Sequence, residues 1–487
     1  MMLNEATMTT RGEDVSDYII GCFQDIRLQK IGALLFKNIC TKMTTCIKYL
    51  AGSRALQVGF SRFLYNKKTS VKEIERSFAE KTNNNCINRN HVLCIQDTVE
   101  VGYPKQHIKK DEFGPTTYGD IKGFFAHPGL IVDAENYDVL GLSSVDPWVR
   151  ADEKVGPLEQ RSIEEKESYY WLETAKKASD NMSNAKLITA VGDRGSDIYE
   201  LFDRIPNERT HLLVRACYDR KLSNGKFVSA HMSEVLVAGE YKFELGNISG
   251  KRKPFNAPRR DDLKVRQARI ATMAVKYSEI EITKLQSKLK PKGNPSVKLT
   301  CVEVREISDV PSGEEEIFWR LFTTHKINSF DDAKQIIEWY QARWTIEQIF
   351  RTMKKKGLQI EDSQVENVDV LLKLFTLSIA SAVTTMMLVN ARDGSTNRQA
   401  TDVFNKNEIL VLSLILKKVE GKTIKQKNPH IINSLSWASW IIARLGGWNG
   451  YACESPSGPM TMYRGLEKFH NYFGGWGLAT YSTGNDQ

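Results

Sequence analysis

The chain has 487 residues, which is enough for two to four domains. Its 41% hydrophobic and 26% charged residues fit an ordinary globular protein, and its formal net charge of +9 favours an anionic partner without proving one. The eight cysteines include no C-x-x-C pair, which argues against a zinc site and a disulfide framework and predicts reduced, intracellular thiols. Residues 1–17 are polar and lean acidic, which does not fit a signal peptide.

The first part of the chain shows a helical pattern. Apolar residues recur at helical spacing in three successive stretches of residues 18–82, and the polar run Asn83-Asn84-Asn85 follows them. We therefore predict a small helical N-terminal domain, residues 1–88, with an asparagine-rich exit.

Apolar runs typical of strands begin at residue 91. Residues 91–98 read as a buried strand with Asp97 near its end, and residues 187–193 read as another strand that ends in Asp193. Further strands are predicted over residues 123–132, 137–142 and 212–215, and helices over residues 164–179 and 195–202. This order of strands and helices predicts an α/β layer.

Residues 218–298 interrupt that layer. They hold the basic runs Lys251-Arg252-Lys253 and Arg259-Arg260 together with short apolar alternations. We predict a mostly β insertion with a basic edge, and a solvated charge run is the alternative. Two strands, residues 299–304 and 317–323, return the chain to the layer.

The most informative stretch is residues 336–354, which we predict to be one helix preceded by a capping pair, Ser329 with Asp332. Four of its residues are spaced by three, four and seven, which places them on one stripe of a helix: Tyr340, Arg343, Glu347 and Lys354. One acid among bases suggests a metal ligand flanked by groups that hold phosphates. The alternative is a solvated, salt-bridged helix face.

The C-terminal part of the chain is predicted to be helical. Residues 374–390 carry no charge, but the stretch is short for a membrane span and holds several Ser and Thr residues, so we predict a buried core helix. Residues 434–447 are predicted to form an amphipathic helix that ends at a pair of glycines.

Three acids suggest the chemistry. Asp97 and Asp193 would lie at the carboxyl ends of neighbouring strands, and Glu347 would come from a helix packed on the same sheet. Three carboxylates suit Mg²⁺ or Mn²⁺, and two such ions can activate an attacking oxygen and stabilise a leaving one. This arrangement predicts phosphodiester cleavage and strand transfer, although a single Asp at a strand end is weak support.

The sequence resembles the DDE transposases of bacterial insertion sequences, in the branch with a Y-(2)-R-(3)-E-(6)-K signature that includes the transposase of the kanamycin-resistance transposon. The four residues on the predicted helix stripe match that signature without a gap. The likeness extends over nearly the whole chain, and its further matches are residues 57–66, 95–98, 164–168, 193–197, 251–253 and 442–447, together with His127, Trp171 and Trp319.

The resemblance implies a role for each site residue. The three acids would bind two Mg²⁺ ions, with Mn²⁺ as a substitute, and the other signature residues would hold phosphates near the cleaved end. Trp319 would stack a base flipped out beside the cut, with a core tryptophan as the alternative. Arg215 and the basic insertion would follow the DNA backbone. Trp437 and Trp440 would pair with a second subunit, with burial inside their own chain as the alternative.

The resemblance also implies the domain plan. It predicts an α/β fold with a ribonuclease H-like mixed sheet, built from residues 89–217 and 299–392 and interrupted by the β-rich basic insertion, residues 218–298. The helical residues 1–88 would bind the DNA ends, and the helical residues 393–487 would form a dimerisation domain. The sequence departs from the family at residues 24–30, which hold Arg27 and Lys30 but fewer bases than the arginine-rich patch usual there, so the resemblance does not carry terminal-repeat recognition over to these two residues.

We therefore expect a bacterial, cytoplasmic cut-and-paste DNA transposase that joins the nucleoid when it is bound to DNA. It would act as a homodimer, without a membrane, on double-stranded DNA: the terminal inverted repeats and the target. Water would nick one strand, the freed 3′ hydroxyl would form a hairpin with the opposite strand, and the reopened end would attack the target. The alternatives are a structure-selective nuclease and a catalytically silent, DNA-binding transposition inhibitor.

Overall fold

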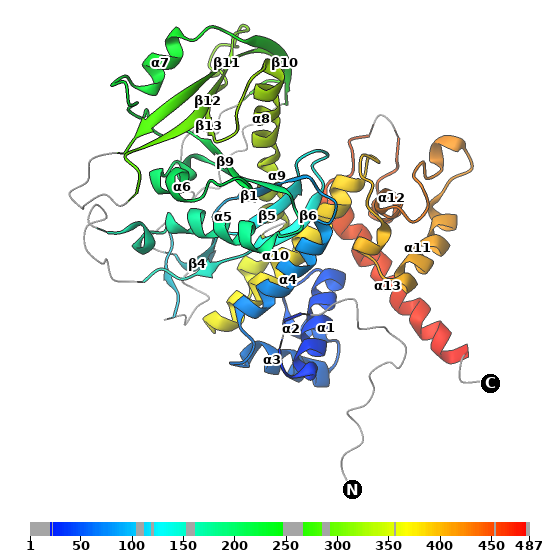
Figure 1. Ribbon diagram of the computed structural model, residues 1–487. Coiled ribbons are helices and arrows are strands. Elements are labelled where there is room, and N and C mark those ends of the chain that lie inside the picture. Colours follow the sequence, from blue (N-terminus) through cyan, green and yellow to red (C-terminus); the bar gives the residue numbers. More distant parts are fainter. Residues whose placement is uncertain are drawn as a thin grey trace.

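The computed structural model describes residues 20–21, 23–103, 112–117, 121–151, 161–246, 266–284, 293–354, 357–451 and 454–483. A large twisted sheet runs through the upper and central parts of the molecule, the N-terminal helices lie below it, and the C-terminal helices lie to its right (Figure 1). This arrangement has the α/β character that the sequence predicts.

The N-terminal region is helical, as predicted. Its helices are α1 (Ile26–Lys42), α2 (Ile47–Ala51), α3 (Arg54–Tyr65) and α4 (Val71–Asn85). Asp25, Ser53 and Ser70 cap the starts of α1, α3 and α4 with their side-chain oxygens, which satisfies backbone N–H groups that have no partner within the helix. Helix α4 packs on the edge of the sheet and on the long core helix described below, and so joins this region to the rest of the chain.

In the described part of the chain, the main sheet has nine strands in the order β10-β11-β12-β13-β9-β8-β1-β5-β6. The strands are β1 (His91–Gln96), β5 (Gly129–Asp133), β6 (Val139–Ser144), β8 (Leu187–Gly192), β9 (Thr210–Arg215), β10 (Gly239–Leu245), β11 (Arg269–Thr283), β12 (Ser296–Glu306) and β13 (Phe318–Thr323). The pairs β1–β8 and β8–β9 are parallel and the others are antiparallel. The parallel centre is buried on both faces, which explains its nearly continuous apolar sequence.

Helices cover both faces of the parallel centre. Leu93 and Ile95 of β1 lie in the core that they share with α8 (Phe330–Ala342), α9 (Trp344–Met353) and α10 (Val368–Ala391). Val92 and Cys94 face the other way and pack with Ala178 of α5 (Tyr169–Asn181). A short helix, α6 (Tyr199–Arg204), connects β8 to β9.

The predicted strand over residues 123–132 is two strands. β4 (Lys122–Ala126) belongs to a small second sheet with β2 (Val99–Tyr103), β3 (Gly114–Pro115) and β7 (Pro147–Trp148), whereas β5 belongs to the main sheet. The break falls at His127 and Pro128. Proline has no backbone N–H to donate to a sheet, which favours a strand end at this point.

The predicted insertion does not stand apart from the layer. It contains α7 (Val228–Glu234), and its strands β10 and β11 extend the main sheet, with β11 paired to β12 from Met273–Glu306 to Thr283–Ser296. The expectation that residues 218–298 interrupt the sheet is therefore wrong, because these residues continue its hydrogen bonding. The basic runs Lys251-Arg252-Lys253 and Arg259-Arg260 lie outside the described residues.

The predicted helix over residues 336–354 is also two helices. Arg343 ends α8 and begins α9, and Lys354 lies beyond the end of α9. At the break, the Arg343 N–H bonds to the Tyr340 carbonyl at 3.2 Å, and the Ile346 N–H bonds to the Arg343 carbonyl at 3.2 Å. These bonds reach back three residues, so the turn is tightened as in a 3₁₀ helix. Arg343 and Glu347 still pair across one turn, whereas Lys354 no longer has helical backbone angles. The predicted capping box of Ser329 and Asp332 is confirmed.

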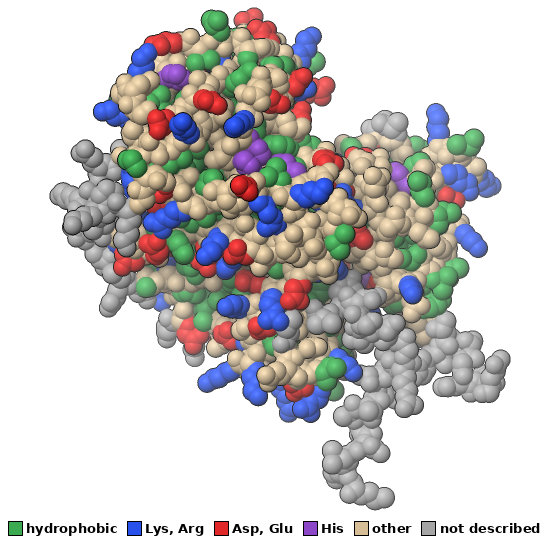
Figure 2. All heavy atoms as spheres, viewed as in Figure 1, with side chains coloured by type: hydrophobic (Ala, Val, Ile, Leu, Met, Phe, Trp, Pro, Cys, Tyr) green, Lys and Arg blue, Asp and Glu red, His purple; other side chains and the backbone are tan. Residues whose placement is uncertain are grey.

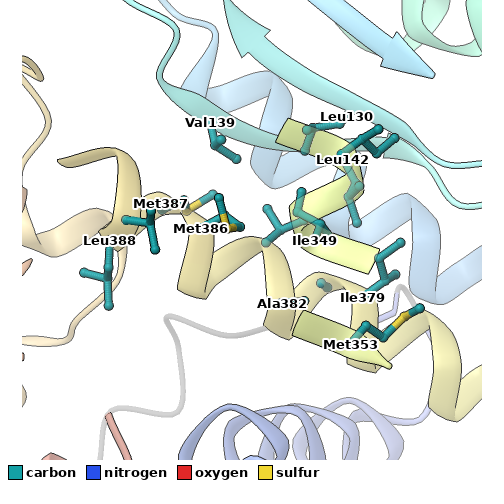
Figure 3. Packing of buried hydrophobic residues seen from close by; sticks show 14 of the residues in the cluster. Leu130, Val139, Leu142, Ile349, Met353, Ile379, Ala382, Met386, Met387 and Leu388 are labelled. Carbon is teal, nitrogen blue, oxygen red and sulfur yellow. The ribbon is translucent and has the colours of Figure 1, made fainter. Parts of the chain in front are cut away.

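Helix α10 forms the centre of the lower core. Within the described residues it is the helix long and apolar enough to cross a membrane, but 89% of its most apolar window is buried in the protein, as expected of a core helix. Side chains of α9 and α10 interdigitate beneath β5 and β6 (Figure 3). The labelled members are Leu130, Val139, Leu142, Ile349, Met353, Ile379, Ala382, Met386, Met387 and Leu388.

The C-terminal helices are α11 (Lys406–Val419), α12 (Leu435–Leu445) and α13 (Pro459–Thr483). Helix α12 ends at Gly446, as predicted, but it is not amphipathic, because its residues are buried on all sides by α10, α11 and α13. Trp437 and Trp440 are 1% and 6% exposed. The expectation that they face a second subunit is wrong for this structure, since their own chain covers them.

Three histidines meet at the amino ends of the central strands. Figure 2 shows histidine side chains gathered at the surface between the upper and lower halves of the molecule. The Thr189 hydroxyl oxygen of β8 lies 2.7 Å from Nε2 of both His91 and His325. The His325 ring stacks on His211 at 4.1 Å, and Trp339 of α8 packs edge-on against His91 at 4.6 Å. A threonine hydroxyl has one proton to donate, so at least one of the two imidazoles must donate to it.

Candidate functional site

Two of the predicted acids lie at the same edge of the sheet. Asp97 directly follows β1, and Asp193 directly follows β8. These strands are parallel, with Ile95 paired to Val191, so their carboxyl ends carry both acids side by side. The topology thus brings together two residues that are far apart in sequence. Asp193 also caps the turn after β8 by accepting the Gly195 N–H at 2.7 Å.

Arg343 connects the third acid, Glu347, to Asp97. Arg343 Nη1 lies 3.1 Å from Asp97 Oδ2, and its Nη2 lies 2.8 Å from Glu347 Oε1. The side chains of Arg343, Asp97 and Glu347 are 17%, 20% and 27% exposed. One partly buried guanidinium therefore links a strand end of the sheet to helix α9.

The charges of the site act on one another. Burial, and after it the negative charge of Asp193, raise the pKa of Asp97 to about 6, although the Arg343 charge partly opposes both effects. Glu347 makes a smaller contribution in the same direction as Asp193. A carboxyl pKa raised by burial and by a second acid is typical of functional sites.

The other signature residues are engaged within the protein. Tyr340 is 5% exposed, and its ring packs edge-on against Trp319 at 5.6 Å. Lys354 Nζ lies 3.3 Å from Glu361 Oε1 and donates to the Glu100 carbonyl. Neither side chain therefore points freely toward a phosphate in this conformation, and their predicted roles as phosphate ligands stay predictions.

Trp319 and Arg215 lie on neighbouring strands near the site. Trp319 is half-buried on β13 between Tyr340 and Phe243, the latter at 6.3 Å. Arg215 ends β9 opposite Leu321, and its Nη2 donates to the Phe318 carbonyl at 3.3 Å. The tryptophan packs on the core and keeps part of its ring exposed, so core packing and base stacking are compatible.

The three acids suit a metal ion by their chemistry, but their placement in the structure does not. Three carboxylates are the oxygen ligands that Mg²⁺ and Mn²⁺ prefer. Among the residues that the structure describes, however, no group of three or more His, Cys, Asp or Glu side chains is placed to hold a metal ion. Arg343 lies between Asp97 and Glu347, and Asp193 is turned to the Gly195 N–H. The predicted three-ligand arrangement is therefore not formed in this conformation.

A buried ion pair that the sequence reasoning missed supports the site. Asp197 accepts the Arg220 Nε–H at 2.7 Å and the backbone N–H groups of Cys217 and Tyr218 at 2.8 and 3.0 Å. It thereby ties the turn after Asp193 to the loop that leaves β9. The sequence match at residues 193–197 pointed to Asp197, but no pattern in the sequence indicated that Arg220 would be its partner.

His127 supports the other acid. Its Nδ1 lies 2.8 Å from the Thr98 hydroxyl oxygen and its Nε2 lies 3.2 Å from Gln96 Oε1, so it contacts both sequence neighbours of Asp97. The ring is fully buried and packs edge-on against Trp171 at 4.4 Å. His127 and Trp171, which the resemblance included without a role, thus help to fix the strand end that carries Asp97.

Comparison with known proteins adds an independent finding. A solved structure of a piggyBac transposase synaptic complex with hairpin DNA is 11% identical, with a TM-score of 0.35 over 82% of this chain and 73% of that chain, which is too distant for any argument. Residues 166–383 match the family described as "Transposase DDE domain", a segment that contains Asp193 and Glu347 and begins after Asp97. This family match supports placing the chain with the DDE-type transposases.

Proposed function

We propose that this protein is a DNA transposase that cuts a mobile element at its terminal inverted repeats and joins the 3′ ends to target DNA. The observation that carries the proposal is the site itself. Asp97 and Asp193 end adjacent parallel strands, and one guanidinium joins Asp97 to Glu347. The match of residues 166–383 to the transposase DDE domain supports the same reading.

The chemistry is two successive substitutions at phosphorus. In cleavage, a water oxygen forms a bond to phosphorus and the bond to the 3′ oxygen breaks, which leaves a 3′ hydroxyl and a 5′ phosphate. In joining, that 3′ hydroxyl forms the new bond to a target phosphorus, and the departing 3′ oxygen takes up a proton. A hairpin would arise if the hydroxyl first attacked the opposite strand, and this route rests on the resemblance alone.

The residues of the chain would bind and orient the DNA. Two divalent ions held by Asp97, Asp193 and Glu347 would supply Lewis-acid stabilisation of the attacking and leaving oxygens when bound. The planar Arg343 guanidinium suits two phosphate oxygens at once, and Lys354, at the other end of α9, offers a point charge. These cations would balance the charge that an anionic backbone brings to three acids.

The wider setting belongs to the same proposal. We propose that the substrate is double-stranded DNA in the cytoplasm of a bacterium and that the active form is a homodimer. Since Trp437 and Trp440 are buried in their own chain, a second subunit would need another surface. Leu410 and Leu414 of α11, which are 50% and 48% exposed, offer apolar side chains for such a contact.

One observation favours a second candidate. Because the described residues include no three-acid group placed for a metal, a catalytically silent DNA-binding inhibitor of transposition is the rival. A structure-selective nuclease would cut but would not join. An assay with pre-cut ends separates the nuclease from the transposase, since joining needs no further cleavage of the donor.

The test is cleavage of DNA ends taken from the sequences that flank the gene of this protein. We expect that Asp97→Ala, Asp193→Ala and Glu347→Ala each lower cleavage by about 10³-fold or more in Mg²⁺ and leave end binding within about twofold. Asp180→Ala, at an exposed carboxylate on α5, is the matched control and should cut normally. Wild-type cleavage rates in any of the three site variants would overturn the assignment.

A further inference from the structure

We infer that Arg343 is a resident counter-ion that holds the acid cluster in a metal-free arrangement until a divalent cation displaces its guanidinium. The inference rests on the proposed function and concerns the regulation of the same site. It starts from the two contacts of one side chain, to Asp97 at 3.1 Å and to Glu347 at 2.8 Å.

The charges explain why such a counter-ion is needed. Asp97, Asp193 and Glu347 bring three carboxylates to one partly buried place, where like charges repel one another more strongly than in water. A guanidinium has N–H groups on separate nitrogens, so it can donate to two carboxylates at the same time. Arg343 therefore neutralises part of the cluster in the absence of another cation.

The contact is more than a surface pair within a helix. Arg343 and Glu347 are four residues apart, a spacing that often gives weak, exposed pairs. The second arm of Arg343, however, reaches Asp97 at a sequence separation of 246, and the side chain is 17% exposed. Its position at the break between α8 and α9 lets it reach both partners.

This arrangement also accounts for the missing three-acid group. Two of the acids direct an oxygen to Arg343, and Asp193 directs an oxygen to the Gly195 N–H. A divalent cation that enters must compete with a positive charge already in place. Once the cation is bound, the released guanidinium is free to bind phosphate. Arg343 would therefore contact DNA only when the metal ion is bound.

The test measures Mn²⁺ binding to the full-length, DNA-free protein by electron paramagnetic resonance of the free ion. We expect Arg343→Gln to tighten Mn²⁺ binding by about tenfold, which corresponds to about 1.4 kcal/mol, because the competing charge is gone. Arg343→Lys keeps the charge and should stay within about threefold of the wild type. Arg351→Gln removes the charge of an exposed arginine that lies over Trp344 on the same helix and should change nothing.

Each outcome decides between the claims. Equal or weaker Mn²⁺ binding by Arg343→Gln, in a protein whose melting temperature shows it to be folded, overturns the counter-ion role. If neither the wild type nor Arg343→Gln shows Mn²⁺ binding that depends on Asp193, as judged by its loss in Asp193→Ala, the proposed function itself fails. If the wild type binds Mn²⁺ through the acids and Arg343→Gln binds equally, only the counter-ion inference fails. The increase in melting temperature caused by Mn²⁺ is the second measurement and should be larger in Arg343→Gln.

Discussion

The two ends of the same central strands contain ionisable groups in opposite states. At the carboxyl ends of β1 and β8, Asp97 and its neighbours are charged, partly exposed and balanced by one arginine. At the amino ends, His91 and His325 share the hydroxyl of Thr189, and burial lowers the pKa of His91 to about 4 and that of His325 to about 3. One end of these strands therefore keeps acids whose burial disfavours their charge, whereas the other end keeps buried imidazole rings that stay neutral.

The largest expected effect comes from replacing Asp97, which should abolish the proposed activity without destabilising the fold. Asp97→Asn should lower cleavage by about 10³-fold, equivalent to about 4 kcal/mol of activation free energy. Its melting temperature at pH 7 should be equal to or above that of the wild type. The reason is that the folded pKa of Asp97 lies above the unfolded value, so the ionised carboxylate is costly to the folded state at neutral pH. Parallel cleavage and thermal-denaturation measurements check this, and a clearly lower melting temperature would contradict it.

A second change tests an acid at this end that we expect to stabilise the fold. Asp197→Ala leaves Arg220 buried without its partner, and removing one member of a buried ion pair costs about 3 to 5 kcal/mol. We expect a lower melting temperature and faster amide hydrogen exchange in residues 193–220. Glu234→Ala removes an acid from an exposed pair with Lys226 and is the control that should change little.

The histidine end should be an acid-sensitive part of the molecule. Because the folded pKa of His91 lies below the unfolded value of 6.5, the unfolded chain binds the proton more readily, and stability falls as the pH falls below 6.5. The loss due to His91 approaches about 3 kcal/mol near pH 4. Denaturant unfolding between pH 4 and 7 measures how the free energy of unfolding depends on pH, and this dependence should be shallower for His91→Gln than for the wild type. His231→Gln, at a histidine of α7 outside this cluster, should keep the slope of the wild type.

The smallest expected effect concerns the helix that leads into the site. Ser329→Ala removes the cap of α8, and the expected cost is about 1 kcal/mol. Ser329→Asp keeps an oxygen acceptor and should recover most of the loss. Equal stability of the alanine variant and the wild type in denaturant unfolding would show that this cap contributes nothing.

The sequence was informative where local pattern decides the structure. The apolar runs before Asp97 and Asp193 predicted strands, and the parallel pairing places both acids at one edge. The Ser329 cap and the uncharged run of α10 were also readable, because a capping box and a buried core helix leave local signatures.

The rest depended on contacts between distant parts of the chain. No glycine or proline marks the break at Arg343, and its contact with Asp97 comes from another element. The pairing of β11 with β12 continues the sheet through a region that looked separate in composition. Helix α12 was predicted to have a polar face, but three other helices cover it, and its sequence does not show how many neighbours surround it.

The long strand β11 has a mechanical consequence. Because β10, β11 and β12 share one backbone hydrogen-bond network with β13, the described part of the insertion cannot swing on a hinge without breaking ladder bonds. Any load applied to the far edge of the sheet is transmitted strand by strand to Arg215 and the acids beside it. The strands of the main sheet would therefore move as one unit, and Asp97, Asp193 and Arg215 at their ends would move with them.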